Sequence, residues 1–385
     1  MRTLRGVTEI GKKALILPGA GARGAYQVGV LKAVASFLPK GAHNPFAILS
    51  GTSAGAINAA VLASRALSFR SAVSEMEKVW ANFTITQVCR ADNWTMIKSS
   101  FHWMAALALG GLGYRNPRSL LDNQPLRELL ERNINFDHIG RSIEKGHIDA
   151  LAITASAYSS PQSVTFFQGA ESLFPWVRKR RVGKRSKINV EHLMASSAVP
   201  FVFPPVMIDG EYYGDGAMRH SAPLSSAIHL GADRMLVIGV RDEELNSESN
   251  KNSSASFPSL GTLAGYMLDT LFMDGLSTDL ERLNQINHVL LKSDQNKQGS
   301  TEHFRPIKTL VVVPKIDIRE VAAHYIQQLP RALRLVLQGL GLKKDNDMRL
   351  VSYLLFESGF TRELIGIGYS DAIALEEELR EFLLN

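Results

Sequence analysis

Residues 14–34 read ALILPGAGARGAYQVGVLKAV and contain the elements that decide the fold. The apolar run 14–17 is ended by Pro18 and a glycine-rich segment, which predicts a short buried strand. From Ala25 to Leu38 apolar residues recur every three or four positions, which predicts a helix that ends before Pro39. A strand, a glycine turn and a helix in this order are typical of a parallel α/β sheet.

The same order recurs further along the chain. Phe46–Leu49 predicts a second strand, residues 51–55 a tight turn, and Ala56–Ala66 a second helix. Further strands are expected at 150–154, 164–167, 235–240 and 309–313, and helices at 260–291 and 371–384. We therefore predict a three-layer α/β fold with a mainly parallel central sheet flanked by helices, plus a helical C-terminal part.

The domain boundaries follow from this pattern. We expect an N-terminal arm over 1–11, the main domain over 12–317 and the helical C-terminal region over 318–385. Residues 246–258, which are rich in Ser and Asn, are expected to form a mobile surface loop.

Composition excludes several classes of protein. The 385 residues are 45% hydrophobic and 21% charged, which excludes disordered and collagen-like chains. The single Cys89 excludes an intramolecular disulfide framework and suits a reducing compartment. The ten histidines lack metal-ligand spacing, so we expect neither a metal nor a cofactor. With no signal peptide and no apolar run long enough to span a bilayer, we expect a cytoplasmic protein, peripheral on membranes at most.

Gly19-Ala20-Gly21-Ala22-Arg23-Gly24 lies between a predicted strand and a predicted helix. Glycines there expose backbone N–H groups at the positive end of a helix, which is a site for anions. The spacing also matches a dinucleotide fingerprint, which requires an acidic residue about 20 positions further on. No acidic residue occurs between Gly11 and Ser74. We therefore interpret the loop as a cradle for an oxyanion or a phosphate, with purely structural turn glycines as the alternative.

Gly51-Thr52-Ser53-Ala54-Gly55 also lies between a strand and a helix and has the form of a nucleophile elbow. The alternative is that Ser53 caps the following helix. Two glycine-rich turns so close in the chain favour acyl transfer, because that reaction needs both a nucleophile and oxyanion donors.

The third motif, Gly214-Asp215-Gly216-Ala217, follows a predicted hairpin and would by itself indicate only a tight turn. Together, the three motifs and the segments 23–31, 195–200, 223–224 and 231–233 resemble the patatin-like phospholipase family over about 14–240. The resemblance implies a Ser53/Asp215 dyad, with Gly51 and Gly55 shaping the elbow and Gly216 and Ala217 following the base. It also implies an oxyanion and substrate loop that contains Gly19, Ala20, Gly21, Arg23 and Gly24.

One residue departs from the family pattern, because Ala20 replaces the middle of three consecutive glycines. An alanine still offers its N–H if its φ is not positive. Arg23 has two interpretations, binding of a substrate phosphate or anchoring of the loop. Asp215 needs burial to raise its pKa from about 4, and we expect Phe201, Phe203 and Val206 to supply it.

The implied activity is hydrolysis of a phospholipid or lysophospholipid ester, of the phospholipase A or lysophospholipase type. Two alternatives stay open. One is a Ser/His/Asp esterase of the ordinary α/β-hydrolase type, for which His220 lies five residues after Asp215. The other is a lipid-binding module on the same fold without turnover. The sequence does not specify the oligomeric state.

Residues 178–187, RKRRVGKRSK, contain seven basic side chains and contribute to a net charge of +6. The run predicts peripheral binding to an anionic membrane surface, with a solvated loop as the alternative and no nucleic acid expected as a partner. We expect Phe174 and Trp176 to enter that interface. The segment 101–114 is interpreted as a lipid-facing rim or as a buried helix.

Overall fold

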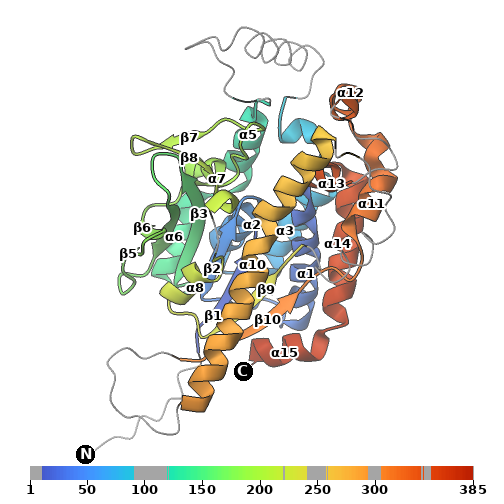
Figure 1. The fold of residues 1–385 in the computed structure, drawn as a ribbon. Helices are drawn as coiled ribbons and strands as arrows, with labels where there is room; N and C mark the ends of the chain where they lie inside the picture. Colours follow the sequence, from blue (N-terminus) through green and yellow to red (C-terminus); the bar gives the residue numbers. More distant parts are fainter. Residues whose placement is uncertain are drawn as a thin grey trace, which may run out of the picture.

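The computed structural model describes residues 11–90, 119, 121–219, 222–240, 257, 259–293, 305–339, 341 and 348–384. These residues form a sheet with the path β10-β9-β1-β2-β3-β4-β6-β5, and β8 adds to β3 and pairs with β7 (Figure 1). The neighbours from β10 to β3 are parallel, whereas β4 and β8 are antiparallel to β3. The strands are β1 Lys13–Leu17, β2 Ile48–Thr52, β3 Ala150–Ala157, β4 Ser163–Gly169, β5 Trp176–Val177, β6 Arg181–Arg185, β7 Val206–Ile208, β8 Glu211–Asp215, β9 Arg234–Ile238 and β10 Lys308–Val312.

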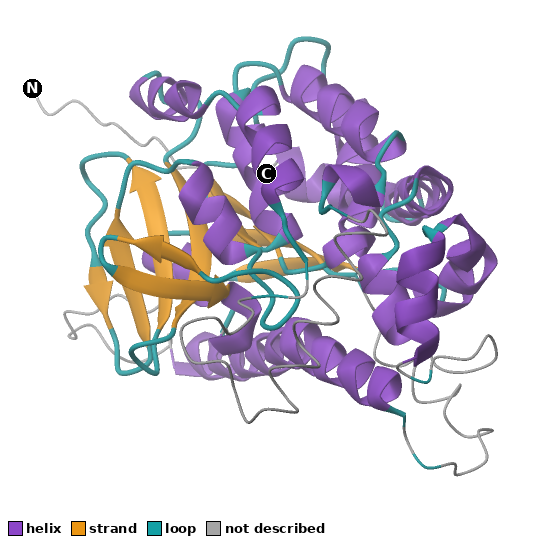
Figure 2. Cartoon of the chain, turned by 90° about the horizontal axis from the view of Figure 1, so that it is seen from above, coloured by secondary structure: helices purple, strands orange, loops and turns teal. Residues whose placement is uncertain are grey.

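Helices cover both faces of this sheet, as the view from above shows (Figure 2). The α-helices are α1 Gly24–Phe37, α2 Ala54–Ser64, α3 Phe69–Ala81, α5 Gln124–Asn133, α6 Phe136–Glu144, α7 Val190–Ser196, α8 Ser225–His229, α10 Leu260–Ser293, α11 Ile318–Tyr325, α12 Arg331–Gly339, α13 Arg349–Leu354, α14 Ser358–Ile373 and α15 Glu376–Leu384. Short 3-10 turns occur at η1 Gly21–Arg23, η2 Ile85–Gln87, η4 Gly216–Arg219 and η6 Ile326–Gln328.

The alternation of side chains along β1 separates two cores. Leu15 and Leu17 pack in the larger core with α1, α2, α3 and α14, whereas Ala14 and Ile16 pack in the smaller core with α8 and the C-terminal half of α10. The N-terminal half of α10 contributes Leu268 to the larger core. The predicted three-layer α/β fold with a mainly parallel sheet is therefore confirmed.

The helical C-terminal part packs closely against the helices on one face of the sheet. Helix α14 lies against α1 (Figure 1), and the Tyr26 hydroxyl donates a 3.1 Å hydrogen bond to Asp371 across this contact. Burial and the negative charge of Asp371 raise the pKa of Tyr26, so the phenol stays protonated. The proposed domain boundaries remain a prediction.

Most predicted elements are present, with small shifts at their ends. The strand expected from Phe46 begins at Ile48, and the helix expected over 371–384 is wrong, because α14 ends at Ile373 and α15 begins at Glu376. Most of the loop 246–258, the segment 101–114, His220 and nearly all of the N-terminal arm lie outside the described residues. None of the helices in the described part is long and apolar enough to cross a membrane.

Candidate active site

Ser53 follows β2 in a sharp turn, and the glycine loop follows β1 at the same edge of the sheet. The two strands are parallel with Leu17 opposite Gly51, so both turns leave the carboxyl ends of neighbouring strands. Ser53 has φ 53° and ψ −127°, a backbone conformation that residues other than glycine rarely adopt. Gly55 allows this turn to close, because a Cβ there would lie 2.0 Å from the Leu17 carbonyl oxygen.

The Ser53 side chain forms no capping hydrogen bond with α2, so the structure does not support the capping alternative. The backbone around it is held from another element. The Ser53 N–H donates to Ser196 Oγ at 2.9 Å, and that hydroxyl donates to the Thr154 carbonyl at 2.6 Å. Ser196 thus connects the elbow to β3. Sequence reasoning missed this role, although Ser196 belongs to the segment 195–200 that carried part of the family resemblance.

Asp215 ends β8, which places it beside the elbow. The register pairs Asp215 with Ala155 of β3, and β3 pairs Thr154 with Thr52, the residue before Ser53. The Asp215 side chain is 1% exposed. Its Oδ1 accepts a 2.9 Å hydrogen bond from the Ala217 N–H, and its Oδ2 has no hydrogen-bond partner among the described residues.

This environment makes the carboxyl far more basic than usual. Burial raises the pKa of Asp215 to about 7, while the Ala217 N–H and the Ser53 hydroxyl, which face the carboxyl, act in the opposite direction. Phe203 is buried and Val206 half-buried, whereas Phe201 is 69% exposed. The expectation that Phe201 shields the carboxyl is therefore wrong.

The glycine loop passes directly beside Ser53. A Cβ on Gly19 would lie 3.5 Å from the Ser53 Cβ, and one on Gly24 would lie 3.1 Å from the Ala54 Cβ. Ala20 has φ −146°, whereas Gly21 has φ +53°. The positive angle therefore falls on a glycine, and the alanine is accommodated without strain. Within the described part of the chain, no acceptor takes the N–H of Gly19 or Ala20.

Arg23 is turned into the protein and is 2% exposed. Its Nε and Nη2 donate to Ser352 Oγ at 3.0 and 2.6 Å, and its guanidinium lies 3.9 Å from the centre of the Tyr353 ring. Its Nη1 lies 3.5 Å from Asp269 Oδ1, which also accepts a 2.8 Å hydrogen bond from the Tyr353 hydroxyl. Arg23 therefore ties the loop to α10 and α13. These partners lie over 240 residues away in the chain, where the sequence offers no signal for them.

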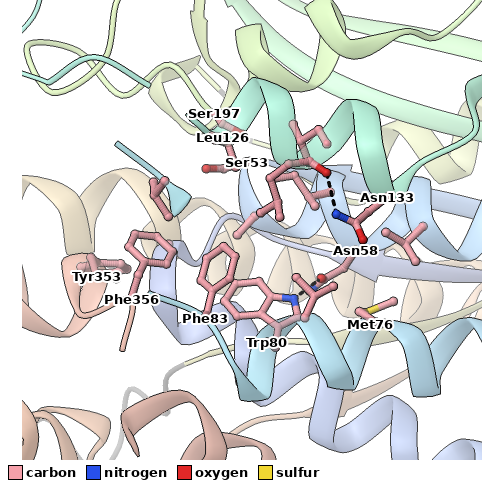
Figure 3. Close-up of a pocket in the computed structure, with 18 of the residues that line it drawn as sticks. Ser53, Asn58, Met76, Trp80, Phe83, Leu126, Asn133, Ser197, Tyr353 and Phe356 are labelled. Carbon is pink, nitrogen blue, oxygen red and sulfur yellow. Dashed lines mark hydrogen bonds between the residues drawn. The ribbon is translucent and has the colours of Figure 1, made fainter. Parts of the chain in front are cut away.

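An apolar cavity of about 110 Å³ begins at Ser53 and Gly21 (Figure 3). It follows one face of α2 through Ile57 and Val61 to Arg65. Its walls come mainly from α3, α5, the segment after α7, α10 and the end of α13, and include Met76, Val79, Trp80, Phe83, Leu126, Leu129, Leu130, Ile134, Val199, Val202, Phe203, Leu268, Phe272, Leu354 and Phe356.

Two polar side chains in this cavity differ in how they are satisfied. Asn58 accepts a 2.9 Å hydrogen bond from Trp80 Nε1 and donates to Gln27 Oε1 at 3.0 Å, so its amide is occupied within the protein. Ser197, which is 6% exposed and also lines the cavity, has no partner for its Oγ among the described residues. The cavity is therefore apolar along most of its length and offers its free hydroxyl groups near Ser53 (Figure 3).

The basic run lies on β5, β6 and their flanks. Arg185 donates to the Gly169 carbonyl at 2.7 Å and Lys187 pairs with Asp137 at 2.8 Å, although both side chains are exposed. Residues 178–180 are exposed as well. The expectation that Trp176 enters an interface is wrong. Its ring is 8% exposed and stacks with Phe167 and His229 at centroid distances of 5.3 and 4.9 Å.

The described residues contain no cluster of three His, Cys, Asp or Glu side chains that could hold a metal ion. The groups that the site itself presents are the serine hydroxyl, the buried carboxyl and the backbone N–H groups of the glycine loop. These are the groups that ester hydrolysis requires.

The sequence of the patatin-like phospholipase family matches residues 15–228, and the chain belongs to this family. The family defines lipid hydrolysis as the general class of activity. No curated protein matches the chain. Among solved structures, VipD from Legionella pneumophila is similar with 12% identity and a TM-score of 0.38, over 96% of this chain and 67% of that one. The ExoU–SpcU complex from the type III secretion system of Pseudomonas aeruginosa is similar with 17% identity and a TM-score of 0.27, over 89% and 68%. These TM-scores are too low for an argument from either structure.

Proposed function

We propose that the protein hydrolyses carboxylic esters of phospholipids or lysophospholipids through Ser53 and Asp215. The observation that carries the proposal is the pairing of an elbow serine with a buried carboxyl whose Oδ2 is unpartnered, at the end of an apolar cavity. A carboxyl with a pKa of about 7 is a usable base near neutral pH, which an ordinary aspartate is not.

In the first half of the reaction, Ser53 Oγ attacks the ester carbonyl carbon and its proton passes to Asp215. The N–H groups of Gly19 and Ala20 donate to the oxyanion, and Asp215 returns the proton to the leaving alcohol as the acyl-enzyme forms. In the second half, water takes the place of the alcohol, Asp215 accepts its proton, and the fatty acid leaves as Ser53 is reprotonated. Asp215 ends each half in the state in which it began.

The cavity supports an acyl substrate. Helix α2 has 11 residues, so the cavity face that follows it is about 16 Å long at about 1.5 Å per residue. With C–C bonds of about 1.5 Å, an extended chain advances about 1.3 Å per carbon, so this face has the length of about a dozen carbons. The cavity volume of about 110 Å³ holds only part of such a chain, so the walls must move apart to admit all of it. Each buried methylene contributes about 0.8 kcal/mol to binding.

Labelling with a fluorophosphonate followed by peptide mapping tests the nucleophile. We expect the label on Ser53, and Ser53→Ala should lose both labelling and turnover while its circular dichroism and Tm stay those of the wild type. Ser197→Ala is the matched control, since it removes a neighbouring cavity hydroxyl and should leave the label on Ser53. A label on another residue, or an active Ser53→Ala, contradicts the proposal.

Two further results separate the alternatives. His220→Ala should retain activity, and a folded but inactive His220→Ala variant would favour the triad. Lipid binding by a wild-type protein that neither takes the label nor turns over any ester would favour the non-catalytic module.

Residues 178–180, three consecutive exposed residues of the basic run, support a separate proposal of contact with anionic lipid surfaces. Replacing these three residues with Gln should weaken binding to anionic vesicles and leave hydrolysis of a soluble ester unchanged. Equal vesicle binding by the variant and the wild type at low salt would identify the run as a solvated loop.

A further inference from the structure

The N-terminal turns of α10 expose an apolar face. Residues 257–268, FPSLGTLAGYML, contain no charged side chain. Leu260 is 68% exposed, Leu263 45%, and Tyr266 and Met267 are each 60% exposed. Residues 260, 263 and 267 repeat at intervals of three and four, so they lie on one stripe of the helix with Tyr266 beside them. Solvent-facing stripes of helices are normally polar or charged, so this stripe requires an explanation.

The opposite side of the same helix forms part of the active site. Leu268 and Phe272 line the apolar cavity. Phe272 covers the glycine loop, since a Cβ on Gly19 would lie 2.4 Å from the Phe272 ring. Helix α10 is held there by α13, because Gly265 lies so close to it that an added Cβ would be 2.9 Å from the Arg349 Cβ. The exposed stripe and the cavity-lining residues therefore lie on different sides of the same N-terminal half of α10.

A second element exposes an apolar side chain at the border of the same cavity. Phe201 is 69% exposed and has φ 65°, a conformation that is rare for a bulky residue. Its neighbours Val199, Val202 and Phe203 line the cavity. The turn is closed by a 2.9 Å hydrogen bond from the Phe203 N–H to the Val199 carbonyl. The chain thus adopts a strained conformation that leaves an aromatic ring in solvent.

Both features lie beside residues of the same cavity, because Leu268 of α10 and Val202 next to Phe201 both line it. Figure 1 places the N-terminal end of α10 and strand β7, which follows the Phe201 turn, at the same upper end, where α5 and α12 also lie. Strands β5 and β6, which carry the basic run, lie at the far edge of the sheet path from β10. The basic run is therefore carried by other elements than the apolar face of α10, so the two can be changed separately.

We propose that the outer face of α10 at Leu260, Leu263, Tyr266 and Met267, together with Phe201, is the surface that inserts into the apolar layer of a lipid aggregate. The face lacks charge and carries aromatic and aliphatic side chains, which is the composition that the boundary between headgroups and acyl chains favours. The same elements line the cavity, so an acyl chain that leaves the lipid meets the cavity without crossing water. This inference rests on the proposed lipid substrate and identifies how the site reaches it.

Binding through an apolar face differs from binding through charge. It should occur on vesicles of uncharged phosphatidylcholine and should be insensitive to salt, because screening acts only on charges. The experiment measures sedimentation of the full chain with phosphatidylcholine vesicles in 0.1 and 0.5 M salt. The test variant is Leu263→Gln/Met267→Gln, and neither residue lines the cavity. The control is Ile286→Gln/Val289→Gln, which changes two residues of 51% and 63% exposure near the other end of the same helix.

We expect the test variant to bind at least about tenfold more weakly, since each substitution removes apolar area from the contact. The control should bind like the wild type, and both variants should hydrolyse a short soluble ester at the wild-type rate. Equal vesicle binding by the test variant, or a wild type that does not bind these vesicles, overturns the inference.

Other occupants of the face give different results. A wild-type dimer that the test variant dissociates in gel filtration would identify the face as a contact between two copies. A test variant with a lowered Tm and lost soluble-ester activity would show that the face packs against the protein's own chain. Either result overturns the lipid assignment. Absence of soluble-ester hydrolysis in the wild type would contradict the proposed function alone, because vesicle binding is measured independently.

Discussion

Replacement of Asp215 by Asn is expected to abolish ester hydrolysis and to stabilise the folded protein in alkaline solution. The carboxyl is 1% exposed and its Oδ2 is unpartnered among the described residues, so the folded state solvates its charge poorly. Burial raises the pKa of Asp215 from 3.8 to about 7. Asparagine has the same shape and still accepts from the Ala217 N–H, but it carries no charge to desolvate.

The sign and size of the effect follow from proton linkage. Below pH 3.8 the Asp215 carboxyl is protonated in both the folded and the unfolded protein, so its ionisation does not change the free energy of unfolding. Between pH 3.8 and about 7 the unfolded carboxyl is ionised and the folded one is not, so the free energy of unfolding falls by about 1.4 kcal/mol per pH unit. Above pH 7 both are ionised and the cost stays constant at about 4 kcal/mol, whereas at pH 5 it is about 2 kcal/mol. The Asn amide adds its own cost of about 1–3 kcal/mol for an unpaired buried donor, which does not depend on pH.

The diagnostic quantity is therefore how the stability difference changes with pH. Urea unfolding of both proteins should show a gain from Asp215→Asn that is about 2.5 kcal/mol larger at pH 8 than at pH 5, with unchanged m-values. Hydrolysis of a soluble ester by the wild type should rise with pH through about 7, as the base loses its proton. Ser53→Ala, which is also expected to be inactive, should show no such pH-dependent gain. If the stability difference between Asp215→Asn and the wild type did not change with pH, the claim that burial raises the pKa of Asp215 would be refuted.

Three further predictions concern the loop and the cavity. Gly21→Ala should lower the free energy of unfolding by about 1–3 kcal/mol and reduce activity, because φ is +53° and the new Cβ would lie 2.5 Å from the Tyr353 carbonyl oxygen. The control Ala20→Gly, at φ −146°, should stay active. Thermal unfolding and an ester assay compare the two variants. Arg23→Lys should lower Tm and kcat, since lysine cannot reproduce the two hydrogen bonds that the buried guanidinium donates to Ser352. A rise in KM confined to phosphate-bearing esters would instead indicate that Arg23 binds phosphate. Val61→Trp should fill the cavity along α2 and lower kcat/KM for long-chain nitrophenyl esters at least about tenfold, while kcat/KM for the butyrate ester should stay unchanged. Equal losses for both esters would place the acyl chain elsewhere.

The sequence alone was sufficient for the local features of this protein. Strands and helices were predictable because they depend on the spacing of apolar residues and on glycines at turns, and both can be read from neighbouring residues. The elbow at Ser53 was predictable in part for the same reason, since Gly51 is required by contacts with Gly55 and Ala56. Gly55 is required by the Leu17 carbonyl of the neighbouring strand. The order of the three motifs also identified the family that the match over residues 15–228 shows.

Features that depend on packing between distant segments were not predictable. Trp176 beside a basic run suggested an interface, but Gly183 on the neighbouring strand leaves room for its ring, which is buried there. Phe201 was expected to be internal, but its turn directs the ring outward. The sequence shows which residues are apolar, but it does not show which of them pack against residues from distant segments.

The environment of the proposed catalytic groups was decided by tertiary structure. Arg23 had two interpretations until Ser352, Tyr353 and Asp269 were found around it. The pKa of Asp215 depends on how completely water is excluded from its carboxyl, and that exclusion comes from β3, β8 and the segments that pack over them. The sequence determined that a serine, an aspartate and a glycine loop are present. Only the fold placed the three together and removed the water, because desolvation depends on every element that surrounds a group.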